Sequence, residues 1–203
     1  MKKIKKFDLQ YSSKDILEFS KYCKKILKSG FLAEAAMVKN FEQEFSKFTK
    51  IKYSNFIGSG TDALELSFKL VKKKKILLQT NNFFAAHVAI ENANKTPVYC
   101  DIELDTLGID VDKMENELKK DKEIGGVCIV HTGGIISKHI NKIIKICKRY
   151  SVLLIEDAAH AHGSFKGQKH AGSFGDVGCF SFFSTKVMTT GEGGMVVTKS
   201  KKI

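Results

Sequence analysis

The stretch Val152–Gly163, VLLIEDAAHAHG, determines how the rest of the chain is interpreted. It opens with apolar residues and changes at Glu156 and Asp157 to a run of small and polar residues. A short apolar run of this kind predicts a strand that is buried in a parallel sheet. Ligands of open α/β sheets bind at the carboxyl ends of the strands, so Asp157 stands where a ligand would lie.

Similar short apolar runs recur on the amino-terminal side of this stretch. Further buried parallel strands are predicted at Asn55–Gly58, Ile76–Thr80, Pro97–Cys100 and Gly126–Val130. Helices are predicted between the strands, at Thr61–Val71, Phe84–Ala93, Val111–Lys119 and Ser137–Arg149. This β-α-β alternation predicts an α/β fold with a mostly parallel sheet and helices on both of its faces.

The two ends of the chain differ from this pattern. Helical spacing predicts a helix over Ser13–Ser29 that stops at Gly30, and a second helix with Val38, Phe41, Phe45 and Phe48 on one face. Near the other end, Gly178–Phe183 and Met195–Thr198 are strand-like and too close for a full helix between them, which favours an antiparallel or hairpin-like addition. We expect one domain over 1–203, with a helical segment at 1–50 and the sheet at 51–203.

Composition limits the classes of function. No stretch approaches the roughly 20 apolar residues of a membrane span, and no apolar signal core follows the lysine-rich start, so we expect a cytoplasmic protein without a membrane partner. The five cysteines are scattered and form no close pair, which favours small buried residues over disulfides or zinc ligands.

The net charge of +12 raises nucleic acid as a partner. The lysines are spread along the whole chain, however, so we expect no nucleic-acid binding. The same basic field would suit an anionic small molecule such as a doubly phosphorylated sugar nucleotide, and composition does not choose between the two.

The segment Gly58–Leu64, GSGTDAL, combines a strand end, a turn of small residues and a helix start. Free backbone N–H groups and the helix dipole favour a phosphate at such a place, here beside Gly60 and Thr61. Taken alone, the segment is more simply explained by Ser59 or Thr61 capping the helix.

Asp157 also allows several interpretations. It could form a structural salt bridge, cap the next turn, or pair with a cationic ring nitrogen of a cofactor. A metal site with His160 and His162 is conceivable, but the other histidines show no ligand spacing that would complete it. We therefore expect no metal, and we expect His160 to be a hydrogen-bonding neighbour of a cofactor.

The segment Cys179–Lys186, CFSFFSTK, is an apolar strand that ends in a lysine. Its aromatic and small neighbours can desolvate the amine of Lys186, lower its pKa and make it nucleophilic toward carbonyl compounds. Schiff-base chemistry is therefore possible at this position.

Together these segments resemble the DegT/DnrJ/EryC1/StrS aminotransferases, which have the aspartate-aminotransferase fold. The resemblance rests on SGTDAL, EDAAHAHG and FSFFSTKVMTTGEGG, joined by PVYCDIELDTLGID and IVHTGG, in the family's order. It implies pyridoxal 5'-phosphate as cofactor, with Lys186 as the Schiff-base lysine and Asp157 as partner of the pyridine nitrogen. Ser181 and the Gly60–Thr61 backbone would hold the phosphate, and Phe83 would stack on the ring. At the position of His160 the family often has glutamine, and histidine can donate a hydrogen bond there too.

The resemblance further implies transfer of an amino group, from glutamate, to a nucleotide-linked keto-deoxysugar destined for polysaccharide, by a homodimer. Family members are about twice as long, and their C-terminal small domain is expected to be missing here, so the chain alone is expected to bind cofactor poorly. Two alternatives remain: a non-catalytic or truncated cofactor-binding remnant, and a sugar dehydratase. In the dehydratases a histidine replaces the anchoring lysine, and Lys186 argues against that alternative.

Overall fold

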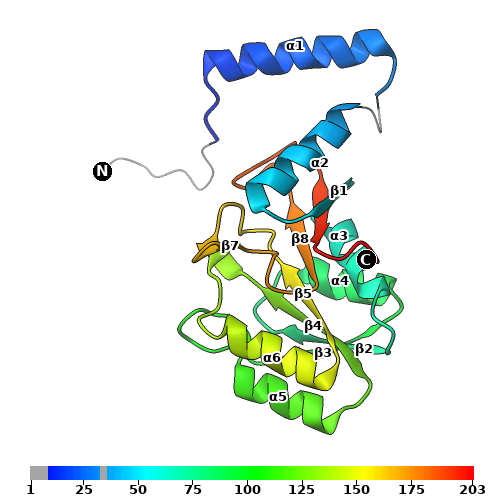
Figure 1. Cartoon of the computed structure of the whole chain (residues 1–203), viewed down its shortest axis with the longest axis vertical. Helices are drawn as coiled ribbons and strands as arrows, with labels where there is room; N and C mark the ends of the chain where they lie inside the picture. Colours follow the sequence, from blue (N-terminus) through cyan, green and yellow to red (C-terminus); the bar gives the residue numbers. More distant parts are fainter. Residues whose placement is uncertain (1–8, 33–35) are drawn as a thin grey trace.

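The computed structural model describes residues 9–32 and 36–203. Its main sheet has seven strands in the order β1-β9-β8-β5-β4-β2-β3 (Figure 1). Their bounds are β1 Tyr53–Ile57, β2 Lys75–Gln79, β3 Thr96–Cys100, β4 Ile124–Val130, β5 Leu153–Asp157, β8 Val177–Ser181 and β9 Gly194–Thr198. The five strands from β3 to β8 in this order run parallel. A separate two-stranded hairpin is formed by β6 Phe165–Lys166 and β7 Lys169–His170.

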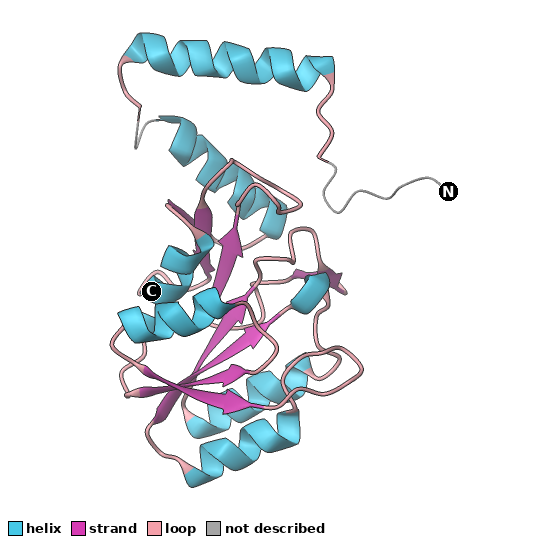
Figure 2. Ribbon diagram, turned by 180° about the vertical axis from the view of Figure 1, so that it is seen from behind, coloured by secondary structure: helices cyan, strands magenta, loops and turns pink. Residues whose placement is uncertain are grey.

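Side chains on the central strands alternate between two helix layers. Leu77, Val127 and Leu154 belong to the core cluster that includes the helices α5 Val111–Lys120 and α6 Ile140–Tyr150. Their strand neighbours Ile76 and Cys128 pack instead toward α3 Gly60–Lys69 and α4 Phe84–Asn92. Figure 2 shows the sheet between these two helix pairs. The predicted α/β architecture, with a mostly parallel sheet covered on both faces, is confirmed.

Strand β9 is antiparallel to both of its neighbours, β8 and β1. The predicted antiparallel addition at the end of the chain is therefore confirmed. The prediction that the first strand is a buried parallel strand was wrong, because β9 returns beside β1 and makes it an antiparallel edge strand. The prediction of burial also fails for β3, the other edge strand, where Tyr99 is 49% exposed.

The two N-terminal helices differ in their packing. The helix α1, Ser13–Ser29, begins at a capping box formed by Ser12 and Asp15 and ends at Gly30, whose φ is 73°. It buries none of its residues and lies apart from the sheet (Figure 1). The helix α2, Ala36–Thr49, buries Phe45, which joins a core cluster with β8 and β9.

The structure also describes the surroundings of the cysteines and the length and polarity of the helices. Four of the five cysteines are buried without disulfides, and Cys23 on α1 is half-buried. Within residues 9–32 and 36–203, no helix is long and apolar enough to cross a bilayer.

Candidate functional site

A cavity of about 790 Å³ lies at the carboxyl ends of the strands. All seven residues that the sequence predicts for the site line it: Gly60, Thr61, Phe83, Asp157, His160, Ser181 and Lys186. They come from the start of α3, the loop before α4, the end of β5 with its following turn, and the end of β8 with its following loop. The fold thus brings together side chains that lie up to a hundred or more residues apart in the sequence.

Asp157 is the last residue of β5 and is 6% exposed. Burial raises the pKa of its carboxyl group, against a hydrogen bond from the Ala159 N–H and the nearby charge of Lys186. The Ala159 N–H donates to Oδ1 at 3.0 Å. Asp157 thus caps the next turn, as one of the simpler interpretations predicted. Within the described part of the chain, no hydrogen bond or ion pair reaches its other oxygen, Oδ2.

Lys186 lies in the loop after β8 and is half-buried. Burial lowers the pKa of its amine, and the nearby carboxylate of Asp157 opposes this shift. A lowered pKa leaves a larger fraction of the amine neutral and nucleophilic near pH 7. The environment predicted from the sequence is therefore present at this residue.

His160 follows Asp157 on the turn at the cavity wall. Burial lowers the pKa of its imidazole, the charge of Lys186 lowers it further, and Asp157 opposes both. Neutral imidazole can both donate and accept a hydrogen bond, so His160 can bind a polar ligand group in this cavity.

The start of α3 closes tightly on the end of β8. Ser59 is the N-cap, and its side chain accepts from the Asp62 N–H at 3.1 Å, so the capping function predicted there is real. A Cβ atom at Gly60 would lie 2.7 Å from Cβ of Ser181, so only glycine permits this approach. Gly60, Thr61 and Ser181 all line the cavity, so backbone N–H groups at a helix start and a hydroxyl lie together there, which is the chemistry of a phosphate cradle.

Phe83 stands at the N-cap of α4, where it makes no side-chain capping bond. Its ring is 63% exposed and packs on Phe84, with centroids 4.4 Å apart. The ring lines the cavity, so it is placed at the rim, where it can contact a ligand.

The cavity wall also contains polar residues that the sequence did not single out, among them Asn81, Thr132 and Glu192. The buried Oγ1 atom of Thr132 has no hydrogen-bond partner within the described part of the chain. A ligand or water would be needed to satisfy it. Only their position in loops that follow strands could have suggested these residues from the sequence.

The two histidines that were considered as metal ligands, His160 and His162, lie in different surroundings. His160 lines the cavity, whereas His162 packs between Phe180 and Phe182, with ring centroids 5.3 Å away in each case. Burial lowers the pKa of His162 to about 4. Among the residues that the structure describes, no group of three His, Cys, Asp or Glu side chains is arranged around a metal position.

The chain is similar to known proteins over most of its length. Residues 14–203 match the model of the DegT/DnrJ/EryC1/StrS aminotransferase family. The chain is 32% identical over 184 residues to GDP-perosamine synthase of Vibrio cholerae, covering 89% of this chain and 49% of that protein. It is 37% identical over 183 residues to UDP-4-amino-4,6-dideoxy-N-acetyl-beta-L-altrosamine transaminase of Campylobacter jejuni, covering 88% and 48%.

A solved structure shows the same arrangement of chain. The aminotransferase from Psychrobacter cryohalolentis superimposes with a TM-score of 0.85 at 26% identity, over 97% of this chain and 50% of that one. The chain therefore has the fold found in these sugar aminotransferases, and it spans about half the length of the relatives it matches. The chain belongs to the DegT/DnrJ/EryC1/StrS aminotransferase family.

Proposed function

We propose that this chain forms the cofactor-binding part of a pyridoxal-phosphate-dependent sugar aminotransferase. The observation that carries the proposal is the convergence of Asp157, Lys186 and the start of α3 on one cavity. A carboxylate, a desolvated amine and a phosphate cradle match the three polar parts of this cofactor, namely its ring nitrogen, its aldehyde and its phosphate.

The residues present fit the cofactor. The phosphate would be held by the Gly60 and Thr61 N–H groups and by the Ser181 hydroxyl, and the close approach at Gly60 leaves no room there for a Cβ atom. His160 would donate to the ring oxygen, and Phe83 would cover one ring face. When bound, pyridoxal phosphate supplies an electron sink for the electron pair released when a proton leaves the amino donor's carbon.

The chain's own residues then have distinct tasks. The carboxylate of Asp157 would hold a proton on the ring nitrogen, because a buried anion stabilises an adjacent cation. The Nζ atom of Lys186 would anchor the cofactor through its aldehyde, and the same Nζ atom would serve as the general base that takes the proton from the donor carbon.

The substrate proposed is a nucleotide-linked keto-deoxysugar, with glutamate as the amino donor. Support comes from the names of the two curated relatives, a GDP-sugar synthase and a UDP-sugar transaminase. The net charge of +12 also favours an anionic substrate of this class. The amino sugar would serve polysaccharide synthesis.

We also propose a homodimer in the cytoplasm. Beside the cavity mouth, Phe83, Phe84 and Val88 are 63%, 67% and 37% exposed, which leaves apolar surface available for a second subunit. Sedimentation at high protein concentration that finds monomer alone would argue against the dimer.

The test of the activity follows the conversion of bound pyridoxal phosphate to its aminated form with glutamate, in wild type and in Asp157→Asn. The variant should retain cofactor yet lose conversion by at least about tenfold, because a buried charge partner is removed. A near wild-type rate in the variant would remove Asp157 from this role. Retained cofactor without conversion in the wild type would favour the alternative of a non-catalytic cofactor-binding module.

A further inference from the structure

Glu156 lies next to Asp157 on β5, yet its side chain points to the opposite face of the sheet, as neighbouring strand residues do. Its side chain is 0% exposed. One oxygen, Oε2, accepts from His131 Nε2 at 2.8 Å and from the Gly172 N–H at 2.8 Å. The other, Oε1, accepts from the N–H groups of Phe174 and Gly175 at 2.7 and 2.5 Å. A buried carboxylate is thus fully satisfied by four donors.

The first element fixed by Glu156 is the loop after β4. His131 is 1% exposed, and its backbone N–H donates to the carbonyl of Asp157 at 3.0 Å. Its own carbonyl accepts from the Gly134 N–H at 2.9 Å, which closes the turn that contains Thr132. This loop forms the cavity wall on one side of Asp157, since Thr132 lines the cavity.

The second element is the turn at 170–176, which carries three of the four donors. It is bonded to the segment around His160: the Ala171 N–H donates to the Ser164 carbonyl at 2.8 Å. The Gly163 N–H donates to Nε2 of His170 at 3.0 Å, while Nδ1 of His170 lies 2.5 Å from the Ala171 carbonyl. The turn therefore connects Glu156 to the wall on the other side of Asp157.

Burying a carboxylate costs several kcal/mol unless hydrogen bonds offset the lost hydration. Here those bonds all come from the two loops that flank Asp157, and none comes from the helix layers. Removal of the carboxylate would leave up to four buried donors unpaired and would release both loops together.

We propose that Glu156 is a positioning residue, whose buried carboxylate fixes the two cavity loops that carry Thr132 and His160 on either side of Asp157. The consequence for cofactor retention rests on the proposed function. The consequence for the loops does not, because the hydrogen bonds to Glu156 join the chain's own residues.

The experiment measures two properties in wild type, Glu156→Gln, His131→Leu and His131→Gln. The first is hydrogen exchange at the amides of Gly134, Gly163 and Gly172 in the unliganded full chain. The second is retention of pyridoxal phosphate, together with its visible absorbance. In His131→Gln, the amide Nε2 can donate in place of the ring nitrogen, so this variant tests rescue. Asp176→Asn is the matched control, because Asp176 lies at the end of the same turn but accepts from the Leu154 N–H instead.

Glu156→Gln and His131→Leu should raise exchange at the loop amides and weaken cofactor retention by roughly 10- to 100-fold, the factor for stranding a buried donor. His131→Gln and the control should stay close to wild type. Unchanged exchange in Glu156→Gln, or faster exchange with unchanged retention and absorbance, would overturn the positioning role. If the wild type binds no cofactor even in a large excess of pyridoxal phosphate, the proposed function fails; the positioning role then stands or falls on exchange at Gly134 and Gly163.

Discussion

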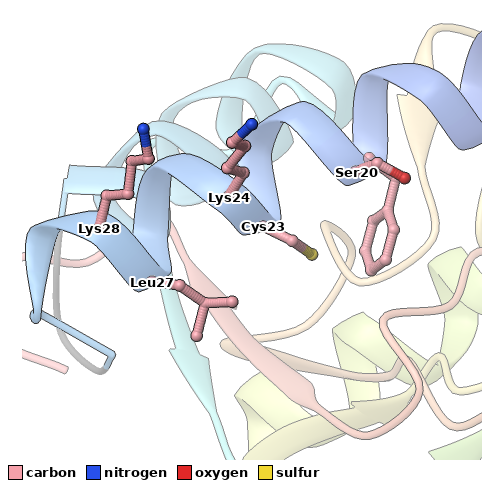
Figure 3. Close-up of a pocket in the computed structure, with 6 residues that line it drawn as sticks. Ser20, Cys23, Lys24, Leu27 and Lys28 are labelled. Carbon is pink, nitrogen blue, oxygen red and sulfur yellow. The ribbon is translucent and has the colours of Figure 1, made fainter.

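Two hollows in the described part of the chain differ in what lines them, and one of the two combines groups that can do chemistry. The hollow beside α1 has a volume of about 510 Å³, and all six residues that line it belong to that helix. Figure 3 shows Cys23 and Leu27 on one side of the helix and the Lys24 and Lys28 amines on the other. The cavity at the carboxyl ends of the strands is lined by loops that follow several strands and by the start of α3.

The difference shows that size does not identify a site. The lining of the α1 hollow contains two lysines and no carboxylate, so it offers no pair of groups that act on each other. In the cavity at the carboxyl ends of the strands, the charges of Asp157 and Lys186 each oppose the pKa shift that burial causes in the other group. The start of a helix lies beside them. Parallel strands that end together account for this convergence.

The largest expected effect compares a lysine from each hollow. Lys186→Ala should reduce glutamate-dependent conversion of the cofactor by roughly 10²- to 10⁴-fold, the range for a positioned proton-transfer group. Lys24→Ala should leave conversion unchanged. Single-turnover absorbance measurements distinguish the two, and equal rates for both variants would remove the functional distinction between the hollows.

The second prediction compares the packing of the two N-terminal helices. Phe45 on α2 is 2% exposed and its ring centroid lies 5.1 Å from that of Phe180, whereas Phe19 on α1 is 69% exposed. Phe45→Ala should lower the free energy of unfolding by about 3–5 kcal/mol. Phe19→Ala should change it by less than about 0.5 kcal/mol. Denaturant unfolding monitored by circular dichroism measures both; a large loss for Phe19→Ala would mean that α1 is packed in solution.

The third prediction concerns His162, whose ring packs against Phe180 and Phe182. Because burial lowers the pKa of His162 to about 4, the unfolded chain takes up a proton before the folded one. Stability should therefore fall as pH drops from about 6.5 to 4, by up to about 3 kcal/mol from this residue. His162→Phe should show a shallower decline across that window in denaturant melts. An unchanged slope would contradict the assignment.

Much of the cavity was predictable because its main residues follow apolar strands. The end of a strand is readable from the sequence, and Asp157 and Lys186 each follow such a run. Side chains whose hydrogen-bond partners come from distant loops were harder to interpret from the sequence. Glu156 stands beside Asp157 in the sequence, but three of its four donors lie in a turn whose shape no local pattern specifies, and the fourth, His131, lies in a distant loop.

Edge and surface positions were harder to predict for the same reason. The pairing of β1 depends on where β9 returns, and β9 is separated from it by most of the chain. The apolar spacing of α1 predicted a helix correctly, yet spacing alone does not reveal whether a partner covers that face. Local periodicity identifies an element, and tertiary contacts determine its surroundings.

The central claim is that the cavity at the carboxyl ends of the strands holds the cofactor through Lys186. One measurement tests this claim most directly. Wild-type chain is mixed with pyridoxal phosphate near neutral pH, reduced with borohydride and digested, and the labelled peptide is identified by mass spectrometry. Because burial lowers the pKa of Lys186, its amine should react ahead of the exposed lysines, and the label should lie on Lys186. Label on another lysine, or label spread over exposed lysines such as Lys24 and Lys28, would contradict the account.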